Sequence, residues 1–128
     1  PAEEPPAGAV PVGEGDLNLD TAGALANAPS GLTATGLKPR AIRLAWLAPH
    51  VGTALAYQVY RVEGSGVTTA NFASRVLVGN VPGGFTSIDD VAVKNNVTYT
   101  YFVVATLPNP DASGTIQSGV SNYATLKL

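Results

Sequence analysis

The sequence predicts an all-β domain, a seven-stranded antiparallel β-sandwich preceded by an extended N-terminal arm. Three observations favour this class. The 14 glycines and 10 prolines fall mostly between short apolar runs, which is typical of many strands joined by turns. Apolar and polar positions alternate within those runs, as they do in strands with one buried face. No long stretch carries Leu, Glu, Lys and Gln at helical spacing, so a helical fold is not expected.

The arm is expected to cover residues 1–29 and the domain residues 30–128, because the composition changes near residue 30. Residues 1–30 hold five acidic and no basic side chains, a net charge of −5, whereas residues 31–128 hold seven basic and four acidic ones, a net charge of +3. The first part is rich in Pro, Ala and Gly and cannot alone bury enough apolar surface to fold. It is either a linker or an arm that docks on a basic surface, its own or a neighbour's.

Two short alternating stretches would let such an arm add to the edge of a sheet. Val10 and Val12 form the first stretch, and Leu17 and Leu19 in "DLNLD" form the second. Extended peptides bind exposed sheet edges through main-chain hydrogen bonds and alternate side chains. We therefore expect these four side chains to contact a neighbouring subunit in an assembly.

The first three strands follow from short runs with a period of two. The first surrounds Leu32 in "GLTATGL", and the second, "AIRLAWL", places Ile42, Leu44 and Trp46 on one face. The third, "LAYQVYRV", has two distinct faces. Tyr57, Val59 and Arg61 lie on one of them, and Gln58, Tyr60 and Val62 on the other.

The remaining four strands complete the expected ladder. "SRVLVGN" and "GFTSIDD" are separated by "NVPGG", a strong turn signal, and "SGVSNYATLKL" closes the chain. Between them "TYTYFVVA" again has two faces. Tyr99, Tyr101, Val103 and Ala105 point one way, and Thr100, Phe102 and Val104 the other.

From Ala28 to Leu128 these segments resemble a fibronectin type III domain of the bacterial sort, an immunoglobulin-like sandwich. The likeness rests on Trp46 in the second strand, "YQVYR" in the third, Tyr99 nine residues after Asp90, and "SN" near the end. The resemblance implies that Tyr99 is a tyrosine corner, whose hydroxyl bonds backbone near the bend between the sheets. It also implies a core in which Tyr101 and Val103 pack against Trp46 and Val59. The insertion "GSGVTTANFAS", residues 64–74, departs from the family pattern.

Few residues in the chain suit catalysis or metal binding, and no cofactor or metal is expected. The chain has no Cys and a single His, His50, in a turn between two strands, so neither a zinc site nor a catalytic triad is indicated. Asp89 and Asp90 lack the spacing of a calcium loop and are expected to support the backbone. The glycosylation triplet beginning at Asn96 falls where Asn would support a turn in any case.

Charge and hydropathy also narrow the classes of partner. A net charge of −2 argues against nucleic acid or an anionic membrane as the main partner. The longest uncharged apolar stretch, residues 44–60, contains Pro49, His50, Gly52 and Gln58, so membrane insertion is not expected. Protein is the expected partner, either other copies of the same chain or a larger assembly.

A candidate contact face is expected on the outer side of the sheet. If Tyr57 and Val59 point into the core, then Tyr60, Val62, Phe102 and Val104 point outward on neighbouring strands. An outward apolar patch with two rings is either an interface with another chain or a surface covered by the insertion or the arm. Both alternatives are consistent with the sequence.

The function expected from these features is that of a non-enzymatic structural or interaction module. It would be a repeating subunit or decoration protein of a large assembly, on a virion or on a cell surface, held by its arm and its exposed sheet face. The alternative is a spacer or carbohydrate-binding accessory domain of a secreted polysaccharide-degrading enzyme. Tyr60 and Phe102 are then the only outward rings available for a sugar.

Overall fold

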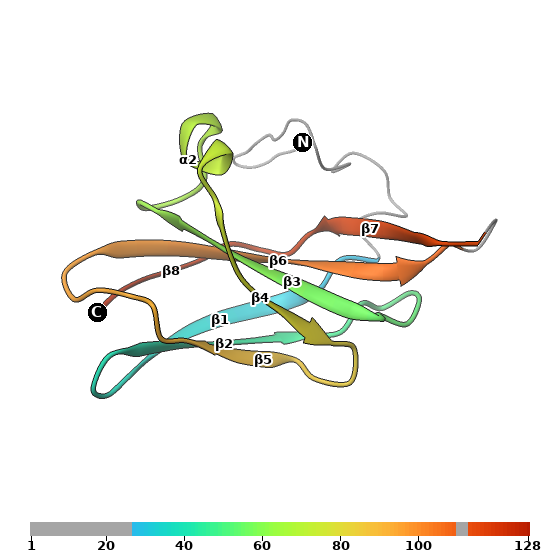
Figure 1. Ribbon diagram of the computed structural model, residues 1–128, viewed down its shortest axis with the longest axis horizontal. Helices are drawn as coiled ribbons and strands as arrows, with labels where there is room; N and C mark the ends of the chain where they lie inside the picture. Colours follow the sequence, from blue (N-terminus) through green and yellow to red (C-terminus); the bar gives the residue numbers. More distant parts are fainter. Residues whose placement is uncertain (1–26, 110–112) are drawn as a thin grey trace.

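The computed structural model describes residues 27–109 and 113–128, which fold into two antiparallel sheets packed face to face (Figure 1). One sheet has the strand order β1-β2-β5, and the other has the order β4-β3-β6-β7, with β8 also pairing with β6. The strands are β1 (Ser30–Leu37), β2 (Ala41–Leu47), β3 (Ala56–Glu63), β4 (Val76–Pro82), β5 (Ser87–Asp90), β6 (Thr98–Pro108), β7 (Thr115–Val120) and β8 (Ala124–Lys127). This arrangement confirms the predicted all-β sandwich.

The core between the sheets contains the side chains that the alternation placed on the inner faces. Ile42 and Leu44 from β2 are fully buried, and Trp46 lies edge-on to the ring of Tyr57, with the ring centroids 5.2 Å apart. The other residues expected in the core lie in the same buried cluster, namely Val59, Tyr99, Tyr101 and Val103. Burial of these large side chains supplies the main driving force for folding.

The last segment differs from the single strand that was expected. β7 pairs with the C-terminal half of β6, β8 pairs with its N-terminal half, and residues 121–123 interrupt them. The reason lies in Ser121 and Asn122. The N–H of Val103 donates to Ser121 Oγ at 2.9 Å, and the amide of Asn122 bonds both backbone groups of Leu32 on the opposite sheet, at 2.8 and 3.0 Å. Ser121 therefore ties this segment to β6, and Asn122 ties it to β1.

The insertion contains a short helix, α2 (Thr69–Ala73), that the sequence pattern did not predict. The Thr68 hydroxyl accepts from the N–H of Asn71, and the Asn71 side chain accepts from the N–H of Thr68, a reciprocal cap. The Asn71 amide also donates to the carbonyls of Glu63 and Gly66. These bonds hold the helix against the end of β3, on the outer side of the sandwich (Figure 1).

Candidate interaction surfaces

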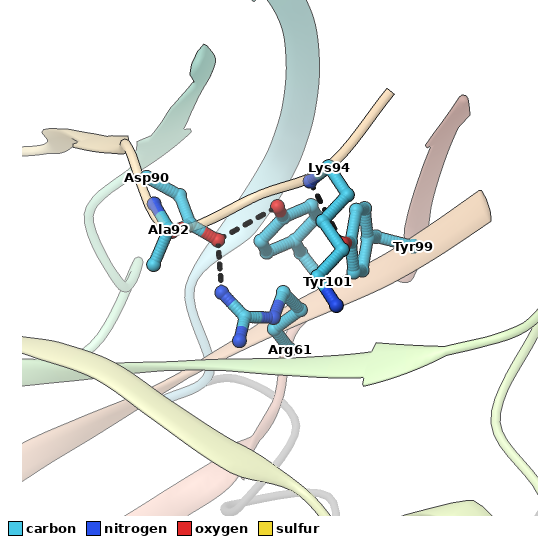
Figure 2. Close-up of polar contacts among 6 residues, drawn as sticks. All are labelled: Arg61, Asp90, Ala92, Lys94, Tyr99 and Tyr101. Carbon is cyan, nitrogen blue, oxygen red and sulfur yellow. Dashed lines mark hydrogen bonds and ion pairs between the residues drawn. The ribbon is translucent and has the colours of Figure 1, made fainter. Parts of the chain in front are cut away.

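A buried polar cluster joins the two sheets at Asp90 (Figure 2). One carboxylate oxygen accepts from Arg61 Nη1 at 2.8 Å and from the Tyr101 hydroxyl at 2.9 Å, and the other accepts from the N–H of Ala92 at 3.1 Å. Asp90 is only 3% exposed, so three bonds to its oxygens are needed to offset the loss of water. Burial and the adjacent carboxylate both raise the pKa of Tyr101.

Beside this cluster, the hydroxyl of Tyr99 accepts from the backbone N–H of Lys94 at 3.0 Å, across the bend between β5 and β6. The contact is the tyrosine corner that the family resemblance implies. The Arg61 guanidinium lies over the Tyr99 ring, 5.3 Å from its centroid. The Asp90 carboxylate and the hydroxyls of Tyr99 and Tyr101 thus all have structural partners, and these contacts stabilise the bend between β5 and β6.

Asp89 also has a structural role. Its carboxylate accepts two bonds from Arg43 on the neighbouring strand, at 2.8 and 3.1 Å. Hydrogen bonding to Arg43 lowers the pKa of Asp89. Both carboxylates of the "DD" pair are therefore engaged by arginines, in line with the structural interpretation rather than a calcium site.

The outward apolar face expected on β3 and β6 is not open to solvent, and that expectation is corrected. Val62, Phe102 and Val104 are at most 2% exposed, and Tyr60 is half-buried. Phe72 of α2 stacks on Phe102, with ring centroids 5.7 Å apart, and Tyr60 stacks on the same ring at 5.3 Å. The insertion thus covers Phe102, which is the second of the two alternatives considered above.

Further side chains complete this outer-face cluster. The guanidinium of Arg75 lies 4.3 Å from the centroid of the Phe72 ring and 5.4 Å from that of Tyr60. Tyr123 meets Phe102 edge-on, and burial raises the pKa of Tyr123 to about 12. Since Phe102 has no exposed surface, it cannot form the open aromatic platform that a bound sugar requires.

The β2–β3 and β4–β5 connections and the start of β7 lie at one end of the sandwich (Figure 1), and most of the exposed large apolar side chains belong to these segments or to the strand ends beside them. The N–H of Trp46 donates to the carbonyl of Thr86, and the N–H of Gly83 donates to the carbonyl of Leu55, which brings the β2–β3 and β4–β5 connections together. A side chain at Gly83 would lie 2.0 Å from the Ala54 carbonyl oxygen, so only glycine fits there. The exposed large residues of these strand ends and connections are Leu47, Val51, Leu55, Phe85 and Ile116.

We call these five residues and the connections that carry them the neutral end. Phe85 is 64% exposed and Leu47 is 62% exposed, which is unusual for such large apolar side chains in one region. No Lys, Arg, Asp or Glu occurs in residues 44–60, 76–88, 102–109 or 113–118, and Asp111 lies outside the described residues. Depletion of charge around exposed apolar groups is characteristic of the central part of protein interfaces.

Sequence reasoning missed this surface because its members stand singly at strand ends and in turns. Leu47, Leu55 and Phe85 lie at the ends of runs whose alternation marks the faces of the sheets and not their ends, and only the topology brings these ends to one place. The four arm residues expected at an interface, Val10, Val12, Leu17 and Leu19, lie outside the described residues.

The described residues offer little that suits other chemistry. His50 is exposed in the β2–β3 connection. In residues 27–109 and 113–128, no three His, Asp or Glu side chains come close enough to hold a metal ion. Within those same ranges, no helix has the length and apolar character needed to cross a membrane.

Comparison with known proteins gives matches among solved structures only. No protein-family model and no curated protein matches the chain. A Fn3-like protein from Clostridium thermocellum is 25% identical, with a TM-score of 0.57, over 77% of this chain and 88% of that one.

Two other solved structures show the same fold at lower identity. A pectate lyase from Pectobacterium carotovorum is 17% identical, with a TM-score of 0.55, and the match covers 79% of this chain but only 27% of the lyase. A structure of titin domains is 15% identical, with a TM-score of 0.58, over 77% of this chain and 30% of that one. Together with the tyrosine corner and the strand order, these likenesses identify the chain as a fibronectin type III-like β-sandwich.

Proposed function

We propose that the protein is a non-enzymatic interaction module that associates with other copies of itself through the neutral end. The observation that carries this proposal is the presence of five exposed apolar side chains at one end of the sandwich, where the described segments hold no Lys, Arg, Asp or Glu. The functional residues are then Leu47, Val51, Leu55, Phe85 and Ile116, rather than the outer face of β3 and β6. A repeating subunit of a virion surface or a cell-surface filament is the context that this role would fit.

The proposal is tested by placing charge on the neutral end of the full chain. In the double variant Phe85→Asp/Leu55→Asp, two carboxylates would have to lose water on association, so we expect complexes of the native chain to dissociate into monomers. The measurement is molar mass by light scattering after gel filtration, over a range of protein concentrations. Both side chains are more than half exposed, so the thermal midpoint should change little.

A matched control uses two exposed apolar residues on the edge strand β4. Val76 and Leu77 are 45% and 46% exposed, and they lie away from the neutral end. The variant Val76→Asp/Leu77→Asp should associate like the native chain. A native chain that stays monomeric at every concentration would refute the proposed function, as would equal dissociation of both variants.

A second candidate is the role of a spacer within a polysaccharide-degrading enzyme. It is favoured by the pectate lyase, of which a domain of this fold forms about a quarter of the chain, at 27% coverage. In that case the natural protein would be a longer polypeptide with a catalytic domain of its own. Mass spectrometry of the protein from its native source distinguishes the two roles, because a repeating subunit would carry no such domain.

A further inference from the structure

We propose that the domain end opposite the neutral end binds the acidic arm, residues 1–29, of a second copy. This inference rests on the proposed function, because association through the neutral end would place that end of one copy against the basic side of the next. It adds a second surface, a partner segment and a direction of assembly.

Four exposed cationic side chains occupy this opposite end. Lys38 and Arg40 lie in the turn between β1 and β2, Lys94 lies in the connection between β5 and β6, and Lys127 lies near the end of β8. We call these four residues the basic end. Figure 1 shows the β1–β2 turn, the β5–β6 connection and the C-terminus on the same side of the sandwich.

Contacts of Leu128 bring the three segments together. The N–H of Asn96, in the β5–β6 connection, donates to the Leu128 carbonyl at 3.1 Å. A side chain at Gly36, just before the β1–β2 turn, would lie 3.0 Å from a methyl carbon of Leu128. Four positive charges from distant parts of the sequence therefore surround one surface.

These cations form no ion pair within the described part of the domain. Arg43 and Arg61 each have an aspartate partner at 2.8 Å, but none of the four residues of the basic end lies within ion-pair distance of a carboxylate in residues 27–109 or 113–128. Clustered like charges repel one another, so an acidic partner would stabilise this surface.

The arm has the complementary charge. It carries Glu3, Glu4, Glu14, Asp16 and Asp20 and no basic residue, and no other part of the chain is so acidic. Oppositely charged surfaces accelerate encounter and fix the orientation of two partners. The charge distribution thus favours the arm of this chain as the ligand of the basic end.

The point where the arm joins the domain lets the arm reach a second copy. Ser30 pairs with Leu47, so the arm begins at the neutral end, and the basic end of the same copy is one strand length away, about 25 Å for eight residues. If the neutral end of one copy faces the basic end of the next, the arm of the first copy begins beside its binding surface. Repeating this head-to-tail contact builds a linear filament or a closed ring.

The basic end also exposes an apolar residue that such a contact could bury. Val91, in the β5–β6 connection, is 71% exposed. The neutral end of a neighbouring copy would remove it from water. The two ends therefore have both charge and apolar surface to contribute to a head-to-tail contact.

Two charge-reversed full chains test the inference. The first reverses the charge of the basic end through Lys38→Glu, Arg40→Glu, Lys94→Glu and Lys127→Glu. The second replaces the five acidic residues of the arm with lysine. Each variant alone should lose the large species of the native chain, whereas an equimolar mixture should regain it, because every arm again meets an end of opposite charge.

A milder pair of variants separates position from net charge. Lys38→Gln/Arg40→Gln and Thr33→Glu/Thr35→Glu each lower the net charge by two, but only the first pair belongs to the basic end. We expect association to weaken in the first variant only, and association of the native chain to fall as salt is raised from 50 to 500 mM. Circular dichroism establishes that each variant is folded.

The outcomes separate the two proposals. Suppose that both charge-reversed chains assemble like the native chain while Phe85→Asp/Leu55→Asp dissociates. The arm then does not hold the assembly, which refutes this inference but leaves the proposed function supported. If heparin or an oligonucleotide binds the basic end, and the charge-reversed chains still assemble like the native chain, the ligand of the basic end is another polyanion. This result also refutes the inference. If the native chain is monomeric throughout, both proposals fall.

Discussion

The carboxylate of Asp90 shows how much a single residue contributes to this fold. It holds Arg61 of one sheet, the Tyr101 hydroxyl and the backbone at Ala92, and it has almost no contact with water. The sequence indicated a structural role for the "DD" pair. The alternation placed Arg61 on the inward face with Tyr57 and Val59, but it could not indicate Asp90 as the partner of Arg61, because Asp90 belongs to the opposite sheet.

We expect Asp90→Ala to destabilise the domain by about 3–5 kcal/mol, because the substitution leaves the Arg61 guanidinium buried without its partner. Asp89→Ala is the matched control. It breaks an exposed ion pair with Arg43 and should cost at most about 1 kcal/mol. Urea unfolding of both variants provides the comparison, and a cost for Asp89→Ala as large as that for Asp90→Ala would contradict this account.

At the scale of elements, the insertion and α2 convert the outer face of β3 and β6 into a second small core. Alternation of residues correctly separates the two faces of these strands, but it cannot say which face solvent reaches. The covering element is too short to be recognised by periodicity, since α2 has five residues. Its position depends on the bonds of Asn71 to the carbonyls of Glu63 and Gly66, which no hydrophobic periodicity indicates.

If the outer face is a covered core, Phe102→Ala should cost about 3–5 kcal/mol, as truncation of a fully buried ring does. Phe85→Ala, at a site 64% exposed on the neutral end, should change the free energy of unfolding by no more than about 0.5 kcal/mol. Chemical denaturation measures both. If Phe102→Ala changes the free energy of unfolding little but abolishes association, the outer face of β3 and β6 is an interface after all, which would contradict this account.

At the scale of the whole molecule, the domain has two unlike ends. In the part of the chain that the structure describes, one end has no Lys, Arg, Asp or Glu and exposes Leu47, Leu55 and Phe85, and the other carries Lys38, Arg40, Lys94 and Lys127. The sequence predicted the sandwich and its core because both depend on local alternation. The polarity of the ends could not be predicted, because it depends on which connections the topology brings together. The opposite charges of arm and domain were the one whole-chain signal visible beforehand.

Hydrogen–deuterium exchange of the full chain, measured across a range of protein concentrations, tests the central claim most directly. If copies associate through the neutral end, amides in residues 48–55 and 83–86 should exchange more slowly as concentration rises, while those of β4 keep their rates. Exchange rates in these two connections that are independent of concentration, in a sample that light scattering shows to be associated, would contradict the account.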